Sequence, residues 1–142
     1  MIMEIGKYIE DLTGLVPGDT LWIGYLPKVK PGTKLPPPDR ITVVLENTPS
    51  PGDPDWPDYV QKEIQVLHRA KFYFTARADA EALYADLHGL AGVELPVINS
   101  GEAYIANTIH GVGTPASIGP KPDDQGYFTF STNYIFRITR LD

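Results

Sequence analysis

The three histidines are the first residues to test for chemistry, because imidazole is both a common metal ligand and a general base. They stand at His68, His88 and His110. None has a partner at the spacing of a helical zinc motif or of a facial triad. We therefore expect surface or strand-end histidines and predict no metal site.

A glycine-containing stretch, "GVGTPA" at 111–116, matches the letters of the dinucleotide-binding pattern G-x-G-x-x-A. That pattern binds phosphate only between a strand and the N-terminus of a helix. Here Pro115 interrupts the stretch and no periodic apolar helix follows, so we interpret it as a flexible turn. Ser117 lies near a G-x-S-x-G pattern, but Pro115 replaces the first glycine, so no nucleophile elbow is present. No cofactor-binding site is predicted.

Carboxylates occur in two groups, Asp123 and Asp124 in one turn and Asp53, Asp55 and Asp58 in another. A catalytic carboxylate needs burial or convergence with another charge to shift its pKa. Exposed turns offer neither, so we predict no catalytic residue and no enzyme. A hydrolase that uses aspartate and histidine remains an alternative for which the sequence shows no arrangement of roles.

The composition narrows the class of protein further. The chain has no cysteine and a net charge of −6. The absence of cysteine excludes disulfides and thiolate chemistry. The negative net charge argues against a protein that binds nucleic acid through electrostatic attraction. No stretch approaches the ~20 apolar residues of a membrane span, and the start lacks the pattern of a signal peptide. We expect a protein made in a cytoplasm and no membrane partner.

Two segments carry the apolar period of an α-helix. The first spaces Ile2, Ile5, Ile9, Leu12 and Val16 by three and four residues, and Gly14 and Pro17 mark its end. The second does the same with Tyr73, Ala76, Ala80, Leu83, Leu87 and Leu90. Its alanines would let the helix lie close to a sheet, and Gly89 is placed as its C′ residue.

Five segments are typical of β-strands: 21–25, 40–47, 62–69, 104–109 and 127–139. In the third, Ile64 and Val66 are expected to point inward and Glu63, Gln65 and Arg69 outward. The last is about twice the usual strand length of ~5–6 residues. Its even positions are Phe128, Phe130, Thr132, Tyr134, Phe136 and Ile138, and its odd positions begin with Thr129, Ser131 and Asn133. Such alternation indicates one buried face and one polar face.

The order α-β-β-β-α-β-β predicts an α+β fold. We expect one domain over residues 1–142, with two helices packed on one face of a mainly antiparallel sheet of about five strands. A long last strand with a polar face could extend past its own domain into a subunit interface, where pairing would cover its edge.

Two proline-rich loops, at about 27–39 and 48–59, interrupt the strands. The first region is positive and the second negative, so the arm of one subunit could meet the opposite arm of its neighbour and close a ring. Trp56 favours an interface, where tryptophan is enriched. Two solvated loops with no partner are the alternative. The candidate interface residues are Lys28, Lys30, Lys34, Arg40, Asp53, Asp55, Trp56 and Asp58.

Two stretches resemble the tail terminator and minor capsid proteins of bacteriophages. In 64–90, a strand containing Ile64, Gln65, Val66 and Arg69 leads into an alanine-rich helix that ends at "LHG". In 117–138, an "IG" turn, a "D..G" turn and an "F-S..Y" strand follow one another, which is similar to the family's last hairpin. The matching residues there are Ile118, Gly119, Asp123, Gly126, Phe130, Ser131 and Tyr134.

The resemblance implies a virion neck protein that is assembled in the host cytoplasm. It implies a ring, usually a hexamer, that caps the tail tube, stops its polymerisation and presents a surface to the head connector or stopper protein. It implies no catalysis and no cofactor. Another head–tail joining protein of the neck is the alternative within the same class.

The odd face of the last strand (Thr129, Ser131, Asn133) is neutral and small. It would suit either the wall of a wet channel or a close subunit contact. In a ring of acidic subunits DNA would only pass through the lumen without being held. From a different class, a small-ligand-binding α+β domain could line a pocket with Trp22, Tyr25, Phe128 and Phe130.

Overall fold

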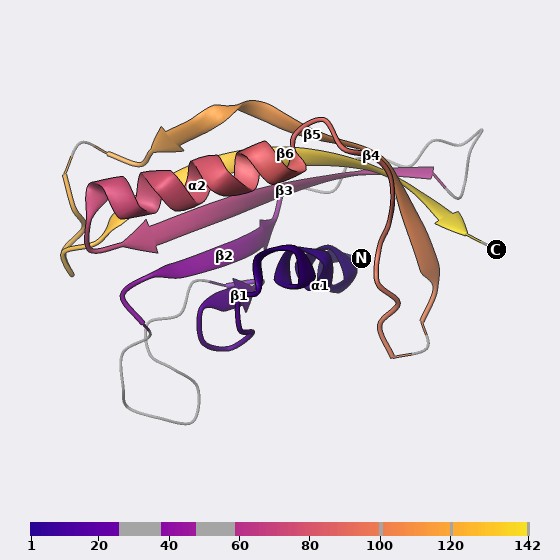
Figure 1. Ribbon diagram of the computed structural model, residues 1–142, viewed down its shortest axis with the longest axis horizontal. Helices are drawn as coiled ribbons and strands as arrows, with labels where there is room; N and C mark the ends of the chain where they lie inside the picture. The colour runs from indigo at the N-terminus through magenta and orange to yellow at the C-terminus, as the bar shows by residue number, and fades with distance from the viewer. Residues whose placement is uncertain (26–37, 48–58, 100, 120, 142) are drawn as a thin grey trace.

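The computed structural model describes residues 1–25, 38–47, 59–99, 101–119 and 121–141 (Figure 1). These residues form two helices and six strands, which confirms the α+β class with one strand more than expected. In chain order the elements are α1 (Ile2–Thr13), β1 (Leu21–Ile23), β2 (Ile41–Glu46), β3 (Tyr59–Ala70), α2 (Tyr73–Leu87), β4 (Ala91–Glu94), β5 (Ala103–Ser117) and β6 (Phe128–Leu141).

All six strands belong to one sheet with the order β1-β2-β3-β6-β5-β4. Every pairing is antiparallel except that of β1 with β2. The additional strand, β4, is short and largely exposed, and it pairs with the first part of β5, from Ile105 to Thr108. The sheet is therefore mostly antiparallel, as predicted.

β6 lies in the centre of the sheet, which corrects the expectation that it reaches past the domain. It pairs with β3 from Phe128 to Thr139 and with β5 from Phe130 to Leu141. Both edges are thus occupied over nearly the whole strand by its own chain. The unusual length serves to hold two other long strands together.

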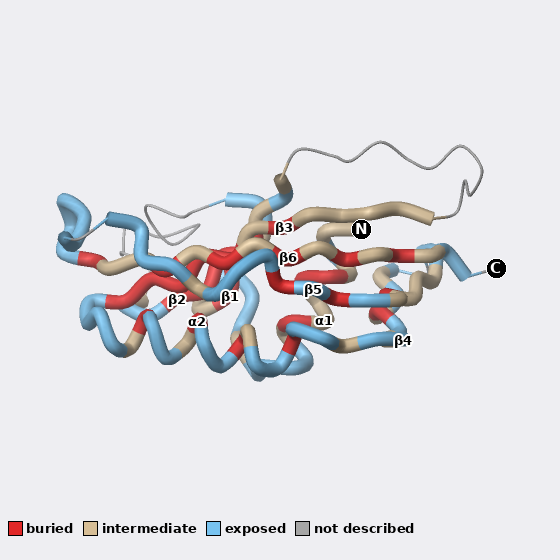
Figure 2. Tube along the Cα trace, turned by 90° about the horizontal axis from the view of Figure 1, so that it is seen from above, coloured by how far each residue is buried: buried red, intermediate tan, exposed pale blue. Residues whose placement is uncertain are grey.

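Both helices pack on the same face of the sheet, here called the helix face (Figures 1 and 2). Ile5 and Ile9 of α1 and Leu83 and Leu87 of α2 belong to one buried cluster with the even-numbered side chains of the central strands. Those strand residues are Ile64, Val66, Tyr134, Phe136 and Ile138. The inward orientation predicted for Ile64 and Val66 is confirmed.

The alanine stripe of α2 brings this helix close to the sheet. Ala76 and Ala80 are fully buried and cluster with Ala70 of β3 and Phe130 of β6. The helix ends at Leu87, and Gly89 follows with φ 87°, so its predicted place at C′ is confirmed. The predicted close packing through small side chains is therefore present.

Several boundaries differ from the prediction. The stretch 111–116 is part of β5 and is not a free turn. A register shift between Val112 and Ala116 accommodates it, and Gly113 adopts φ 78° there. β3 begins at Tyr59, three residues before the predicted strand 62–69. Val16 lies beyond the end of α1 and is exposed.

Candidate functional site

The side of the central strands that faces away from the helices carries mostly polar side chains, and we call it the polar face. On β6 it includes Thr129, Ser131 and Asn133, all half-buried. Across the strand pair, Asn133 lies opposite Gln65 and Ser131 lies opposite Leu67 of β3. The alternation predicted from the sequence therefore places these three residues together on one surface.

Hydrogen bonds between neighbouring strands order this polar face. Gln65 Nε2 donates to Ser131 Oγ at 2.8 Å, and Asn107 Nδ2 donates to Thr139 Oγ1 at 2.6 Å. Asn47 Nδ2 lies 3.4 Å from Asn133 Oδ1, at the long end of the range for a hydrogen bond. Around Thr129, Ser131 and Asn133 the face is thus neutral and polar, and its own side chains hold it in place. Glu63, Arg69 and Arg137 add charges elsewhere on the same face.

At one end of this side of the sheet, an apolar cluster replaces the polar residues. Trp22, Ile41, Val43 and Leu67 form it. Beside it Arg69, predicted to point outward into solvent, is buried, with its guanidinium 4.3 Å from the centre of the Tyr127 ring. A cation–π contact of this kind lets a charged side chain tolerate burial.

Of the interface residues predicted in the proline loops, only Arg40 lies within the described residues. Arg40 Nε donates to Asp79 Oδ2 at 2.7 Å, and Arg40 Nη2 contacts Asp79 Oδ1. This bidentate pair joins the start of β2 to α2 within one subunit. The pair raises the pKa of the Arg40 guanidinium, because the carboxylate stabilises its charge. Lys28, Lys30, Lys34, Asp53, Asp55, Trp56 and Asp58 lie outside the described residues.

A cleft of about 820 Å³ opens between the end of α1, the start of β2 and the middle of α2. Its walls are largely apolar, and the Arg40–Asp79 pair lies at its rim. Sequence reasoning missed it, because its walls come from three segments that are far apart in the chain. The residues that line the cleft include Leu12, Val16, Thr42, His68, Ala82 and Asp86.

His68 is a polar group among these apolar walls. Its side chain is only 2% exposed, and Nδ1 lies 3.2 Å from Thr42 Oγ1. Among the described residues, Nε2 has no hydrogen-bond partner. Burial lowers the pKa of His68 to about 4, although the charge of Asp79 opposes that shift. The sequence predicted a surface or strand-end histidine, and the burial of the His68 side chain shows that the predicted exposure is wrong.

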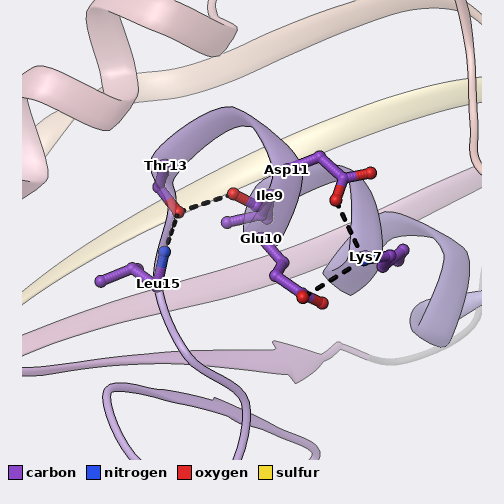
Figure 3. A network of polar contacts seen from close by, with 6 residues as sticks. All are labelled: Lys7, Ile9, Glu10, Asp11, Thr13 and Leu15. Atoms are coloured by element: carbon purple, nitrogen blue, oxygen red, sulfur yellow. Dashed lines mark hydrogen bonds and ion pairs between the residues drawn. The ribbon is translucent and has the colours of Figure 1, made fainter.

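The end of α1 forms one wall of the cleft, and local sequence fixes where the helix stops (Figure 3). Thr13 Oγ1 donates to the carbonyl of Ile9 at 2.7 Å, and Leu15 N donates to Thr13 Oγ1 at 3.3 Å. Gly14 then adopts a left-handed conformation with φ 74°. Lys7, one to two turns earlier, pairs with Glu10 and Asp11 (Figure 3).

The other two histidines have a packing role. Tyr84 stacks on His88 with 4.8 Å between ring centroids, and His110 lies 5.2 Å from His88. The backbone N–H of Gly111 donates to His88 Nδ1 at 2.9 Å. Within the described part of the chain, no group of three or more histidine, cysteine, aspartate or glutamate residues could hold a metal ion.

The aromatics proposed for a ligand pocket do not converge on one cavity. Trp22 contacts Tyr25 edge-to-face and is buried in the apolar cluster on the side away from the helices. Phe130 is buried on the helix face with the α2 alanines. The two sets thus lie on opposite faces of the sheet, and neither lines the large cleft.

Comparisons with known proteins give one match. The sequence model of a family described as "Bacteriophage tail terminator protein" matches residues 8–140. Neither the curated proteins nor the solved structures gave a match. No helix in the described residues is long and apolar enough to cross a membrane.

Proposed function

This chain belongs to the bacteriophage tail terminator family, and we propose that it completes the phage tail by forming a ring. The ring, a hexamer in this proposal, caps the last ring of the tail tube and ends its polymerisation. Its other side meets the connector or stopper protein of the head. The protein acts by shape, with no catalysis and no cofactor, and it remains in the virion after assembly in the host cytoplasm.

The family match over residues 8–140 carries this proposal, because it spans both helices and all six strands apart from the first turns of α1 and the last residue of β6. The direct test adds the purified chain to polymerising tail tube protein and measures tube lengths by electron microscopy. We expect shorter tubes with rings at their ends, and light scattering of the separated complex should give the subunit number. Tubes that grow to the same length with and without the chain would contradict the proposal.

We also propose that the polar face lines the lumen of the ring. Its neutral side chains offer phosphate no cation at Thr129, Ser131 or Asn133. The net charge of −6 per chain repels DNA rather than holding it. DNA would then pass through the ring without a tight contact.

An Asn133→Lys variant tests the lumen assignment. We expect its rings to retain DNA at least about tenfold more tightly at low salt than wild-type rings, because each copy adds a cation toward the phosphates. Stability should change by less than about 1 kcal/mol, since the site is half-buried and polar. Filter binding at several salt concentrations measures retention.

Gln125→Lys is the matched control, because it adds the same charge at an exposed turn. Equal DNA retention by the two variants would argue against a lumen position for Asn133. Loss of the ring in Asn133→Lys alone would assign the polar face to a subunit contact instead.

The oppositely charged proline loops are proposed as a contact between neighbouring subunits. Reversing either charge, Lys30→Glu or Asp55→Lys, should weaken assembly several-fold at low salt, and combining both reversals should restore part of it. Sedimentation velocity at low and high salt measures the effect, which screening should reduce. Unchanged assembly in both single variants would leave the loops without this role.

A further inference from the structure

Two exposed aromatic side chains stand at the junction of β3 and α2. Phe72 and Phe74 are each 75% exposed, although large apolar side chains are normally covered. Tyr73 between them is anchored, because its ring packs edge-to-face on Phe128 and Phe130. The three residues, here called the aromatic tip, therefore hold two exposed phenylalanines on a fixed base at the start of α2. The junction of β3 and α2 can be followed in Figure 1.

The cleft beside α1 has the complementary shape and chemistry. Leu12 and Val16 at its edge are themselves exposed, and Ala82 leaves space on the α2 side. His68 Nε2 at the floor has no partner among the described residues. An occupant must therefore bring apolar surface and one hydrogen-bonding group, which a peptide segment supplies through its backbone.

The electrostatics of the two surfaces are also complementary. At the tip, the N-terminus of α2 has no side-chain cap and no acidic residue in its first turn. The flanking cations Lys71 and Arg77 pair within the same subunit, with Asp39 and Glu81. At the cleft, the C-terminus of α1 has no basic residue in its last turn, and Asp39 and Asp86 line the opening. The positive end of α2 at the tip thus matches the negative end of α1 and the Asp86 carboxylate at the cleft.

We propose that the aromatic tip of one copy inserts into the cleft of the next copy around the ring. Tip and cleft are different surfaces of the same chain, so the contact is heterologous and repeats from subunit to subunit until the ring closes. Phenylalanine anchors in a pocket, surrounded by matched charges, are the usual centre of a protein interface. This inference rests on the proposed assembly and adds a second contact between neighbouring subunits to the one proposed for the proline loops.

Cross-linking between single-cysteine variants tests the contact directly, because the chain has no cysteine of its own. A tagged Phe74→Cys protein is mixed with an untagged Ala82→Cys protein and treated with a short bismaleimide. We expect a tagged–untagged dimer at least about tenfold more abundant than with Ala85→Cys as the second protein. Ala85 is the matched control, because it is exposed on α2 and does not line the cleft.

Substitutions on either surface should weaken assembly without unfolding the chain. Ala82→Trp fills the cleft and Ala85→Trp adds the same bulk elsewhere on α2, while Phe72→Ser with Phe74→Ser removes the anchors. We expect association at least about tenfold weaker for Ala82→Trp and for the double serine variant, and unchanged association for Ala85→Trp. Circular dichroism melts verify that each variant is folded.

The outcomes separate this contact from the proposed ring. A ring that forms normally in Ala82→Trp and gives no selective cross-link overturns the contact and leaves the ring in place. A selective cross-link in a closed dimer supports the contact and contradicts the ring. A chain that stays monomeric at high concentration and gives no cross-link overturns both.

Discussion

Replacing Phe136 with alanine is expected to lower the free energy of unfolding by about 3–5 kcal/mol, the usual cost of removing a buried phenylalanine. Phe136 is fully buried on the helix face at the centre of β6, opposite Lys62 of β3 and Ile109 of β5. It belongs to the cluster that joins both helices to the sheet. Urea unfolding at neutral pH measures the loss. It is a large share of the free energy of unfolding of a typical protein, which is ~5–15 kcal/mol.

The neighbouring residue provides the control. Ile135 precedes Phe136 on the same strand, and its side chain is half-buried on the opposite side of the sheet. We expect Ile135→Ala to cost less than about 2 kcal/mol, because fewer apolar contacts are lost. Similar losses for Ile135→Ala and Phe136→Ala would contradict the division of β6 into a core face and a polar face.

The elements with a strong internal period were predictable from the sequence. The alternation along 127–139 predicted β6 with the correct faces, and the stripe through Ala76 and Ala80 predicted α2 and its close packing. In these segments the spacing of apolar residues and the requirement for burial agree, so local pattern and tertiary structure give the same answer.

Other elements depend on contacts that no local pattern records. Gly111, Gly113 and Pro115 favour a turn, yet β5 continues through them because its partner β6 extends alongside. β4 is short, contains Gly92 and has mostly exposed residues, so pairing with β5 rather than side-chain burial defines it. The strand order, and therefore the central position of β6, could not be predicted from local sequence patterns either.

The candidate functional surfaces also divide into those that a local sequence pattern predicts and those that depend on the fold. Thr129, Ser131 and Asn133 lie on one strand, so their shared face could be predicted from the period of two. The cleft joins α1, β2 and α2, and the exposure of Phe72 and Phe74 depends on how α2 docks on the sheet. Assembly surfaces of this second kind require the fold before they can be recognised.

His68 is expected to make the protein less stable in mild acid. Burial lowers its pKa to about 4 in the folded chain, from 6.5 for an ordinary histidine. Between these two values the unfolded chain binds the proton and the folded chain does not, so the free energy of unfolding falls as pH falls. The stability that the buried neutral His68 allows is fully present above pH 6.5, and it is lost progressively as the pH falls from 6.5 to about 4. From pH 7 to pH 5 we expect a loss of about 2 kcal/mol from this residue.

Urea unfolding of the wild type and of His68→Gln at both pH values isolates this residue, because the carboxylates contribute equally to both proteins. The loss between pH 7 and pH 5 should be about 2 kcal/mol smaller in His68→Gln than in the wild type. Equal pH dependence in the two proteins would mean that water reaches the floor of the cleft and solvates the imidazolium. The same measurement thus reports whether the cleft floor is dry before any partner occupies it, since only a dry floor leaves His68 Nε2 with a hydrogen bond to gain.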